Sequence, residues 1–352
     1  MGDKSHEDTL HEHVAQRVDR LRLSVTELIH GTHSNVVVDL RIAAARILKG
    51  SDHPLRPDPT GGPLEDREGP QSRMMANNDR GVIKDVDRLQ DMSIVVVGLN
   101  GMGCMIAETF CRSGIGKIYL CDNTAVFKAD LGRMFFQPEH VGFSRMGELD
   151  NALRLINHTV LVEQLHVDLF DTDECNELKD SLFHTPTKPH LVFLCVDDPP
   201  LTGYFNALGL ECDVPVVHAT MGYEGLSGHV VTSIRGKTRC LVCYRTPMLV
   251  LPRRSLPETN APAKRALPVL PASSPALPMF ESIVAGIAAH NALKHLLGFG
   301  TVSPYIRYSG LDETFETEPS VARGAPRTPP VTCSSALCRQ YNDALYKHKG
   351  RK

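Results

Sequence analysis

From residue 92 onwards, short apolar runs rich in β-branched residues alternate with longer stretches in which apolar positions recur every three or four residues. The short runs are typical of buried strands, and the longer stretches are typical of helices that pack on one face. The predicted strands are Ser93–Val97, Lys117–Cys121, Val160–Val167, Leu191–Val196, Val214–His218 and His229–Ile234. The predicted helices are Met102–Ser113, Ser144–Ile156, Asp173–Phe183 and Leu201–Glu211. This alternation indicates βαβ units, so it predicts an α/β fold with a doubly wound, mostly parallel sheet.

The segments on either side of this region follow other patterns. Residues 1–70 hold one amphipathic stretch, Val14–Leu28, and then a run dense in proline, glycine and charge, so we expect a disordered or helical extension that ends in a flexible linker. Residues 252–278 contain seven prolines, which excludes a regular helix. An apolar helix is predicted over Phe280–Leu297, and strands are expected to return over 301–316.

Composition and charge narrow the class of protein. The chain has 352 residues, of which 42% are hydrophobic and 22% charged, so disorder throughout is excluded. A net charge of −3 lacks the electrostatic footprint of a general nucleic-acid binder. No apolar run is long enough to cross a membrane, and the first residues are polar and acidic, unlike a signal peptide. We therefore expect a cytoplasmic protein that binds neither nucleic acid nor membrane.

A glycine-rich turn follows the first predicted strand. Gly98, Gly101 and Gly103 allow a tight turn and let backbone N–H groups approach a phosphate at the start of the next helix. Asp122 ends the second strand, where it can accept hydrogen bonds from ribose hydroxyls. The pattern predicts a nucleotide site of the Rossmann-like type, although the spacing differs from the usual G-x-G-x-x-G and the glycines can also serve only to shape the turn.

Four of the ten cysteines form two closely spaced pairs, Cys240 with Cys243 and Cys333 with Cys338. Four thiolates complete a tetrahedral zinc site with no open position, so we expect structural zinc that fastens the C-terminal segment to the sheet domain. A redox-active Cys-x-x-Cys is the alternative, but it leaves the second pair without a role. The other six cysteines lie mostly in apolar runs and are interpreted as small core residues.

Several phrases occur in a fixed order along the chain: the glycine turn, Asp122, Arg133 to Pro138 (RMFFQP), Cys195 to Asp197 (CVD), Gly222 to His229, Phe299 to Ser303 (FGTVS) and the two cysteine pairs. In this order the chain resembles the ubiquitin-activating (ThiF/MoeB-like) superfamily over residues 71–347. Within it, the chain is most similar to enzymes that activate the ubiquitin-fold modifier. The resemblance implies ATP- and Mg²⁺-dependent adenylation of the modifier's C-terminal glycine, capture on a cysteine, transfer to a conjugating enzyme, and a homodimer.

The resemblance also assigns roles to individual residues. It implies that Arg133 and Arg145 contact the phosphates and that Asp197 interacts with Mg²⁺. The glycines and Asp122 would belong to the same ATP site. Attack of a carboxylate on the α-phosphate brings two anions together, so cations are needed there. The alternatives are that the two arginines are solvated surface charges and that Asp197 is a helix cap ahead of Pro199 and Pro200.

The chain departs from the family pattern at several positions. Asn100 replaces a turn glycine, Asp130 replaces an asparagine, and Arg145 replaces a lysine. The thioester cysteine of the family falls on or near Ser273, and a serine hydroxyl is a much weaker nucleophile, so Ser273 is interpreted as an ordinary loop residue.

These observations predict three parts and leave two other functions open. The parts are the extension 1–70, an adenylation domain over 71–347 with a crossover loop at 252–279 and a zinc-tethered tail, and a basic C-terminus at 348–352. The main alternative to an activating enzyme is a catalytically impaired relative that acts as a zinc-stabilised scaffold or partner subunit. A nicotinamide-dependent oxidoreductase would leave the cysteine pairs and the Phe-Phe-Gln-Pro phrase unexplained.

Overall fold

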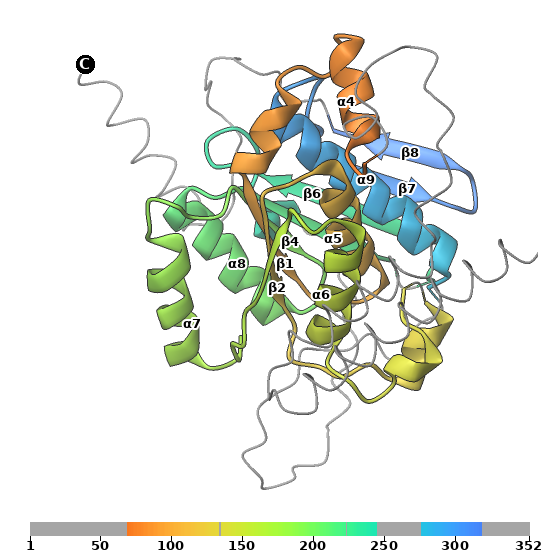
Figure 1. Ribbon diagram of the computed structural model, residues 1–352. Coiled ribbons are helices and arrows are strands. Elements are labelled where there is room, and N and C mark those ends of the chain that lie inside the picture. The colour runs from red at the N-terminus through yellow and green to blue at the C-terminus, as the bar shows by residue number, and fades with distance from the viewer. Residues whose placement is uncertain (1–68, 134, 223, 245–275, 319–352) are drawn as a thin grey trace, which may run out of the picture. The chain divides into compact units, whose positions relative to one another are not determined.

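The computed structural model of the chain describes residues 69–133, 135–222, 224–244 and 276–318 (Figure 1). Several expected features lie outside these ranges: the N-terminal helix and linker, most of the crossover loop with Ser273, the pair Cys333 and Cys338, and the basic C-terminus. Within the described ranges, every helix falls short of the length and apolarity that crossing a membrane requires.

In the described part of the chain, eight strands form one sheet in the order β3-β2-β1-β4-β5-β6-β7-β8. The strands are β1 (Ser93–Val97), β2 (Lys117–Cys121), β3 (Leu161–Gln164), β4 (Leu191–Leu194), β5 (Val216–Met221), β6 (Ser227–Ser233), β7 (Tyr305–Ser309) and β8 (Thr314–Thr317). β1 to β5 pair in parallel, and β6 to β8 extend the sheet with antiparallel pairs. The prediction of a mostly parallel sheet is confirmed, with β3 and β4 shorter than expected.

Helices cover both faces of this sheet. They are α4 (Ser72–Asp79), α5 (Gly101–Ser113), α6 (Arg145–Ile156), α7 (Thr172–Leu178), α8 (Pro199–Cys212) and α9 (Pro278–Leu297). Short helical turns supplement them: η1 (Val86–Asp91), η2 (Lys128–Gly132), η3 (Pro138–His140), the π-turn η4 (Lys179–Phe183) and η5 (Leu241–Tyr244). α4 and the short turns at η1, η2, η3 and η5 had no counterpart among the predicted elements, because segments this brief show little periodicity.

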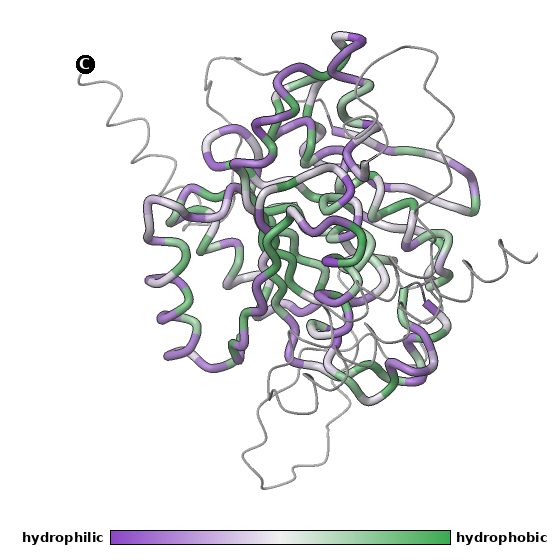
Figure 2. The backbone as a smooth tube through the Cα atoms, in the orientation of Figure 1, coloured by the Kyte–Doolittle hydropathy of each residue, from purple (hydrophilic) through white to green (hydrophobic). Residues whose placement is uncertain are grey.

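Alternate side chains of the strands belong to two separate hydrophobic cores, one on each face of the sheet. Ile94 and Val96 pack with α5, α6 and α9 on one face, whereas Val95 and Val97 pack with α7 and α8 on the other. Figure 1 shows these helices on opposite sides of β1, β2 and β4, and Figure 2 shows the hydrophobic residues concentrated in those central strands. Since strand residues alternate between faces, both sets must be apolar, which explains the unbroken apolar runs in the sequence.

The sheet topology places the predicted nucleotide residues at one edge. The chain leaves β1 toward β2 on one side, while β4 lies on the other side of β1, so the strand order reverses between β1 and β4. Ligands of doubly wound sheets bind at the carboxyl ends of the strands that flank such a reversal. Gly98, Asp122 and Asp197 follow the carboxyl ends of β1, β2 and β4 respectively.

Candidate functional site

The glycine turn after β1 is closed by contacts that leave no room for side chains. Gly98 has φ +84°, in the left-handed region that favours glycine, and a Cβ on Gly103 would overlap the carbonyl oxygen of Gly98. The side chain of Asn100 caps α5 by accepting a hydrogen bond from Gly103 N (3.1 Å) and donates another to Cys195 O (2.7 Å). The Asn100 side chain therefore ties the glycine turn to the residue that follows β4.

Asp122 holds the same turn from the other side. Its carboxylate accepts hydrogen bonds from Leu99 N (2.7 Å), Thr124 N (2.8 Å) and Thr124 Oγ1 (2.5 Å), and the residue is only 2% exposed. These contacts join the ends of β1 and β2. Asp122 is thus at the predicted place, and its carboxylate is engaged in shaping the site as well as bordering it.

Arg145 is buried in a carboxylate cage. Its Nη2 donates to both oxygens of Asp130, at 2.8 and 2.7 Å, and its Nη1 lies 3.6 Å from Asp122 Oδ2. The side chain is 4% exposed, so the alternative of a solvated surface charge is wrong for this arginine. Asp130 also accepts a hydrogen bond from Phe127 N (2.8 Å). The two departures Asp130 and Arg145 are therefore one feature, a buried ion pair.

Arg133 is paired with a residue that the sequence analysis did not single out. Its Nη1 donates to Glu281 Oε1 at 2.7 Å, and the two side chains are 7% and 0% exposed. Glu281 lies in the first turn of α9, and burial raises its pKa although the Arg133 guanidinium opposes that rise. The available signal was a carboxylate near the start of an otherwise apolar helix, a residue type that is rarely buried without a partner.

Asp197 lies beyond β4, and its carboxylate makes no hydrogen bond or ion pair with any other described residue. The adjacent Asp198 caps α8 by accepting a hydrogen bond from Leu201 N (2.9 Å), so the capping alternative belongs to Asp198 and not to Asp197. Burial, together with the charge of Asp198, raises the pKa of Asp197 to about 6. A hard, half-buried carboxylate at this edge fits what Mg²⁺ requires of a protein ligand.

A cavity of about 470 Å³ opens beside Asp122, within the size range of small-molecule sites. It is lined by the residues that follow β2 and β3 and by the start of α6: Asp122, Asn123, Thr124, Ala125, Ser144, Met146, His166, Val167 and Asp168. His166 and Asp168 were absent from the predicted site, because nothing in the sequence shows how the loop after β3 folds back.

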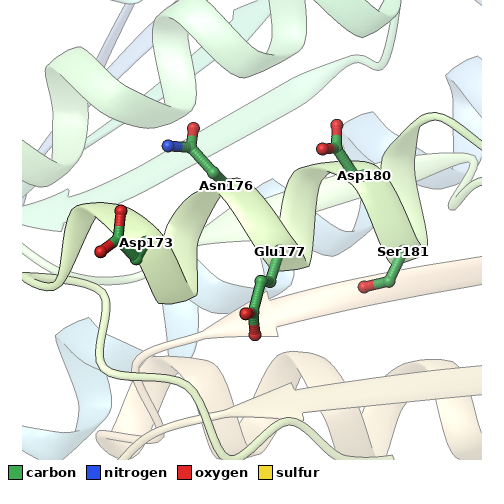
Figure 3. A pocket seen from close by; sticks show the side chains of 5 residues that line it. All are labelled: Asp173, Asn176, Glu177, Asp180 and Ser181. Carbon is green, nitrogen blue, oxygen red and sulfur yellow. The ribbon is translucent and has the colours of Figure 1, made fainter.

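A second depression, of about 910 Å³, lies along α7 and η4. Figure 3 shows its side chains spaced along this helical segment: Asp173, Asn176, Glu177, Asp180 and Ser181. Three of these five residues are acidic and none is basic, so the surface repels phosphate and is a poor nucleotide site.

The structure places all six dispersed cysteines in the core: Cys104, Cys111, Cys121, Cys175, Cys195 and Cys212. Burial raises the pKa of each of these thiols. They are therefore protonated near neutral pH and poor nucleophiles. None of these six thiols therefore offers a reactive thiolate.

Cys240 and Cys243 lie at η5 with their sulfur atoms 3.4 Å apart, and Cys243 N donates to Cys240 O (3.0 Å). This turn aims both sulfur atoms to one side, as a chelating pair requires. The other pair lies outside the described residues, and the described residues include no group of three or more side chains that could hold a metal ion.

Comparisons with known proteins find one matching family and several similar proteins. The sequence model of the ThiF family matches residues 73–332. Ubiquitin-like modifier-activating enzyme 5 of Gallus gallus is 32% identical over 278 residues, 78% of this chain and 66% of that protein. The enzyme of the same name from Oryza sativa subsp. japonica is 30% identical over 77% of this chain and 62% of its own length. The chain thus spans slightly less than two thirds of these relatives.

Solved structures support the fold alone. The crystal structure of E. coli MccB with ATP superposes with a TM-score of 0.57 at 18% identity, covering 77% of this chain and 74% of the MccB chain. SeMet PaaA gives a TM-score of 0.54 at 17% identity, covering 74% and 86%. Both likenesses extend over most of the chain, as expected if the described domain has their architecture.

The Asp130–Arg145 pair should behave as one unit in a double-mutant cycle. Asp130→Asn leaves a buried guanidinium short of its main partner and should cost about 3–5 kcal/mol of unfolding free energy in urea titrations. The double variant with Asp130→Asn and Arg145→Lys should lose less unfolding free energy than the two single variants together, by about 1 kcal/mol or more. As a control, Glu316→Gln in the exposed pair with Arg307 should cost at most about 0.5 kcal/mol. Strict additivity of the two site changes would contradict a coupled pair.

The Asp197 pKa predicts a pH-dependent stability. Because the folded-state pKa is about 6 against an ordinary 3.8, ionisation destabilises the fold progressively as the pH rises from about 4 to about 6. Asp197→Asn should therefore raise the melting temperature above pH 6 and have no effect below pH 4, measured by thermal scans across pH. The exposed Asp91→Asn serves as the control. A gain that is equal at all pH values would show that burial of this charge is not its cause.

Proposed function

The chain belongs to the ThiF family, and on that basis we propose that it is an adenylating enzyme that activates a ubiquitin-like modifier. Its relatives named ubiquitin-like modifier-activating enzyme 5 support this class of reaction. The observation that carries the proposal is the gathering of Arg133, Arg145, Asp122 and Asp197 around the glycine turn at the carboxyl edge of the sheet.

The proposed reaction joins two anions. A carboxylate oxygen of the modifier's C-terminal glycine bonds to the α-phosphorus of ATP, the bond from that phosphorus to its bridging oxygen breaks, and pyrophosphate leaves. The guanidiniums of Arg133 and Arg145 would spread the charge that develops, and the cavity beside Asp122 has the size for a nucleoside. Asp197 would hold Mg²⁺, which when bound would neutralise phosphate charge.

We further propose that none of the six dispersed cysteines carries the reaction beyond the adenylate. The six dispersed thiols are buried and have raised pKa values, so an acyl group cannot reach a thiolate on any of them. Acylation at Ser273 would give an ester and would require a general base.

A second candidate function rests on a specific observation. Both phosphate-side arginines are already paired with carboxylates of the same chain, Arg133 with Glu281 and Arg145 with Asp130. Such pairing favours a catalytically impaired relative that serves as a scaffold or partner subunit. Nucleotide turnover separates this candidate from the first.

The partners follow from the resemblance. We propose that the modifier is of the ubiquitin-fold modifier type, that a conjugating enzyme accepts it, that two copies of the chain associate, and that the protein works in the cytoplasm. The names of the relatives support a ubiquitin-like modifier in general.

The adenylation step is tested by ATP–pyrophosphate exchange. With ATP, Mg²⁺ and the ubiquitin-fold modifier, the purified full-length chain should incorporate labelled pyrophosphate into ATP. Arg133→Gln should reduce the exchange rate about a hundredfold or more, because it removes a charge from the reacting phosphates. Arg307→Gln, at the exposed pair on β7, should leave the rate unchanged. No exchange with any ubiquitin-like modifier would favour the scaffold.

We also propose that zinc joins Cys240 and Cys243 to Cys333 and Cys338. Support comes from the approach of the first two sulfur atoms in the η5 turn and from the short spacing of the second pair in the sequence. A closed site of four thiolates would be structural and would take no part in adenylation.

Elemental analysis tests the metal. The purified protein should contain about one zinc per chain, and Cys240→Ser or Cys333→Ser should lower that content and the melting temperature together. As a control, the variant Cys175→Ser, changed at a buried cysteine outside the proposed zinc site, should contain as much zinc as the wild type. A protein that folds normally with no zinc, or with zinc after both replacements, would contradict the proposed site.

A further inference from the structure

Glu281 places a buried negative charge at the start of α5, where a nucleotide phosphate would lie. The residue is 0% exposed, and a Cβ on Gly101, the first residue of α5, would overlap its Oε2. One carboxylate oxygen accepts from Arg133 at 2.7 Å, while the other, Oε2, is buried and has no hydrogen-bond partner within the described residues. A helix N-terminus attracts anions, so a carboxylate held here competes with a phosphate for the same field.

The charges around this turn do not favour a polyanion. Within the described residues, the guanidiniums of Arg133 and Arg145 face three carboxylates, those of Asp122, Asp130 and Glu281. Two positive charges against three negative ones leave a net charge of about −1 before Asp197 is counted. A triphosphate must therefore break one of these pairs to reach a guanidinium.

Of the three carboxylates, Glu281 is held least firmly. Asp122 and Asp130 each accept further hydrogen bonds from backbone N–H groups, which fix them in their loops. Among the described residues Glu281 has Arg133 as its one hydrogen-bond partner, and its second oxygen carries the desolvation cost of an unsatisfied buried group. It also rises from the first turn of α9, next to Leu277 and Met279, which are exposed.

We infer that Glu281 is a built-in competitor for the phosphates of the nucleotide and sets the affinity of this site for ATP. This inference rests on the proposed function, since it assumes that Arg133 contacts phosphate. Removing the charge of Glu281 would leave Arg133 in place, deprived of its internal counter-ion and open to a phosphate oxygen. Ligands that lack a polyphosphate, such as adenosine, would bind with the same affinity after the change.

The test compares the wild-type chain with Glu281→Gln, which keeps the shape and a hydrogen-bond acceptor for Arg133 but removes the charge. Binding of Mg·ATP, inorganic tripolyphosphate and adenosine is measured by calorimetry on the full chain. The dissociation constants of ATP and tripolyphosphate should fall about tenfold or more, and that of adenosine should not change. Glu316→Gln, which also unpairs an arginine but lies on β8, should change none of the three.

Two results would overturn the inference. If ATP and tripolyphosphate bind both proteins equally, Glu281 is no competitor and the inference is overturned, whereas the proposed function stands on the ATP binding itself. If neither protein binds ATP or adenosine, the inference and the proposed function fail together. Should Glu281→Gln fail to fold, Glu281→Met provides the same loss of charge with an apolar side chain suited to the start of an apolar helix, and the expected tightening is the same.

Discussion

The balance of buried charge at the carboxyl edge of the sheet governs the rest of the site. Two guanidiniums are buried there, and an unpaired charge in such a place would cost several kcal/mol. The chain meets this constraint with its own carboxylates, drawn from the end of β2, from η2 and from the first turn of α9. Ion pairs thereby hold together the stretch 122–145 between β2 and α6, and join it to the distant first turn of α9.

Asp130 and Asn100, two of the departures noted in the sequence, each have a structural explanation. Asp130 adds a negative charge near the expected phosphates, yet the same carboxylate satisfies Arg145. Asn100 removes a turn glycine, yet its side chain caps α5 and ties it to Cys195 O. Each of these residues is matched by a local partner, so the carboxyl edge of the sheet is closely packed and its arginine is neutralised internally.

Local patterns predicted most of the architecture. The apolar runs located β1, β2, β4 and β5 within a few residues, because buried parallel strands are read directly from unbroken apolar stretches. The glycine turn lies between β1 and α5, and Asp122 directly follows β2, as the sequence pattern indicated. Glu281 was missed because its partner lies 148 residues away in the sequence, and no local period records such a pairing. The cap on α8 fell to Asp198 for a related reason, since adjacent carboxylates are indistinguishable until the helix start is known.

The position of Glu281 in α9 links the nucleotide edge to the helix that follows the crossover segment. α9 packs along its length against α5 and against β5 and β6, so most of the helix is fixed by the core. Only its first turn carries the carboxylate, beside the exposed Leu277 and Met279. A polyphosphate that draws Arg133 away from Glu281 would therefore loosen this one turn first. Filling of the site would in this way alter the conformation of the chain immediately before Pro278.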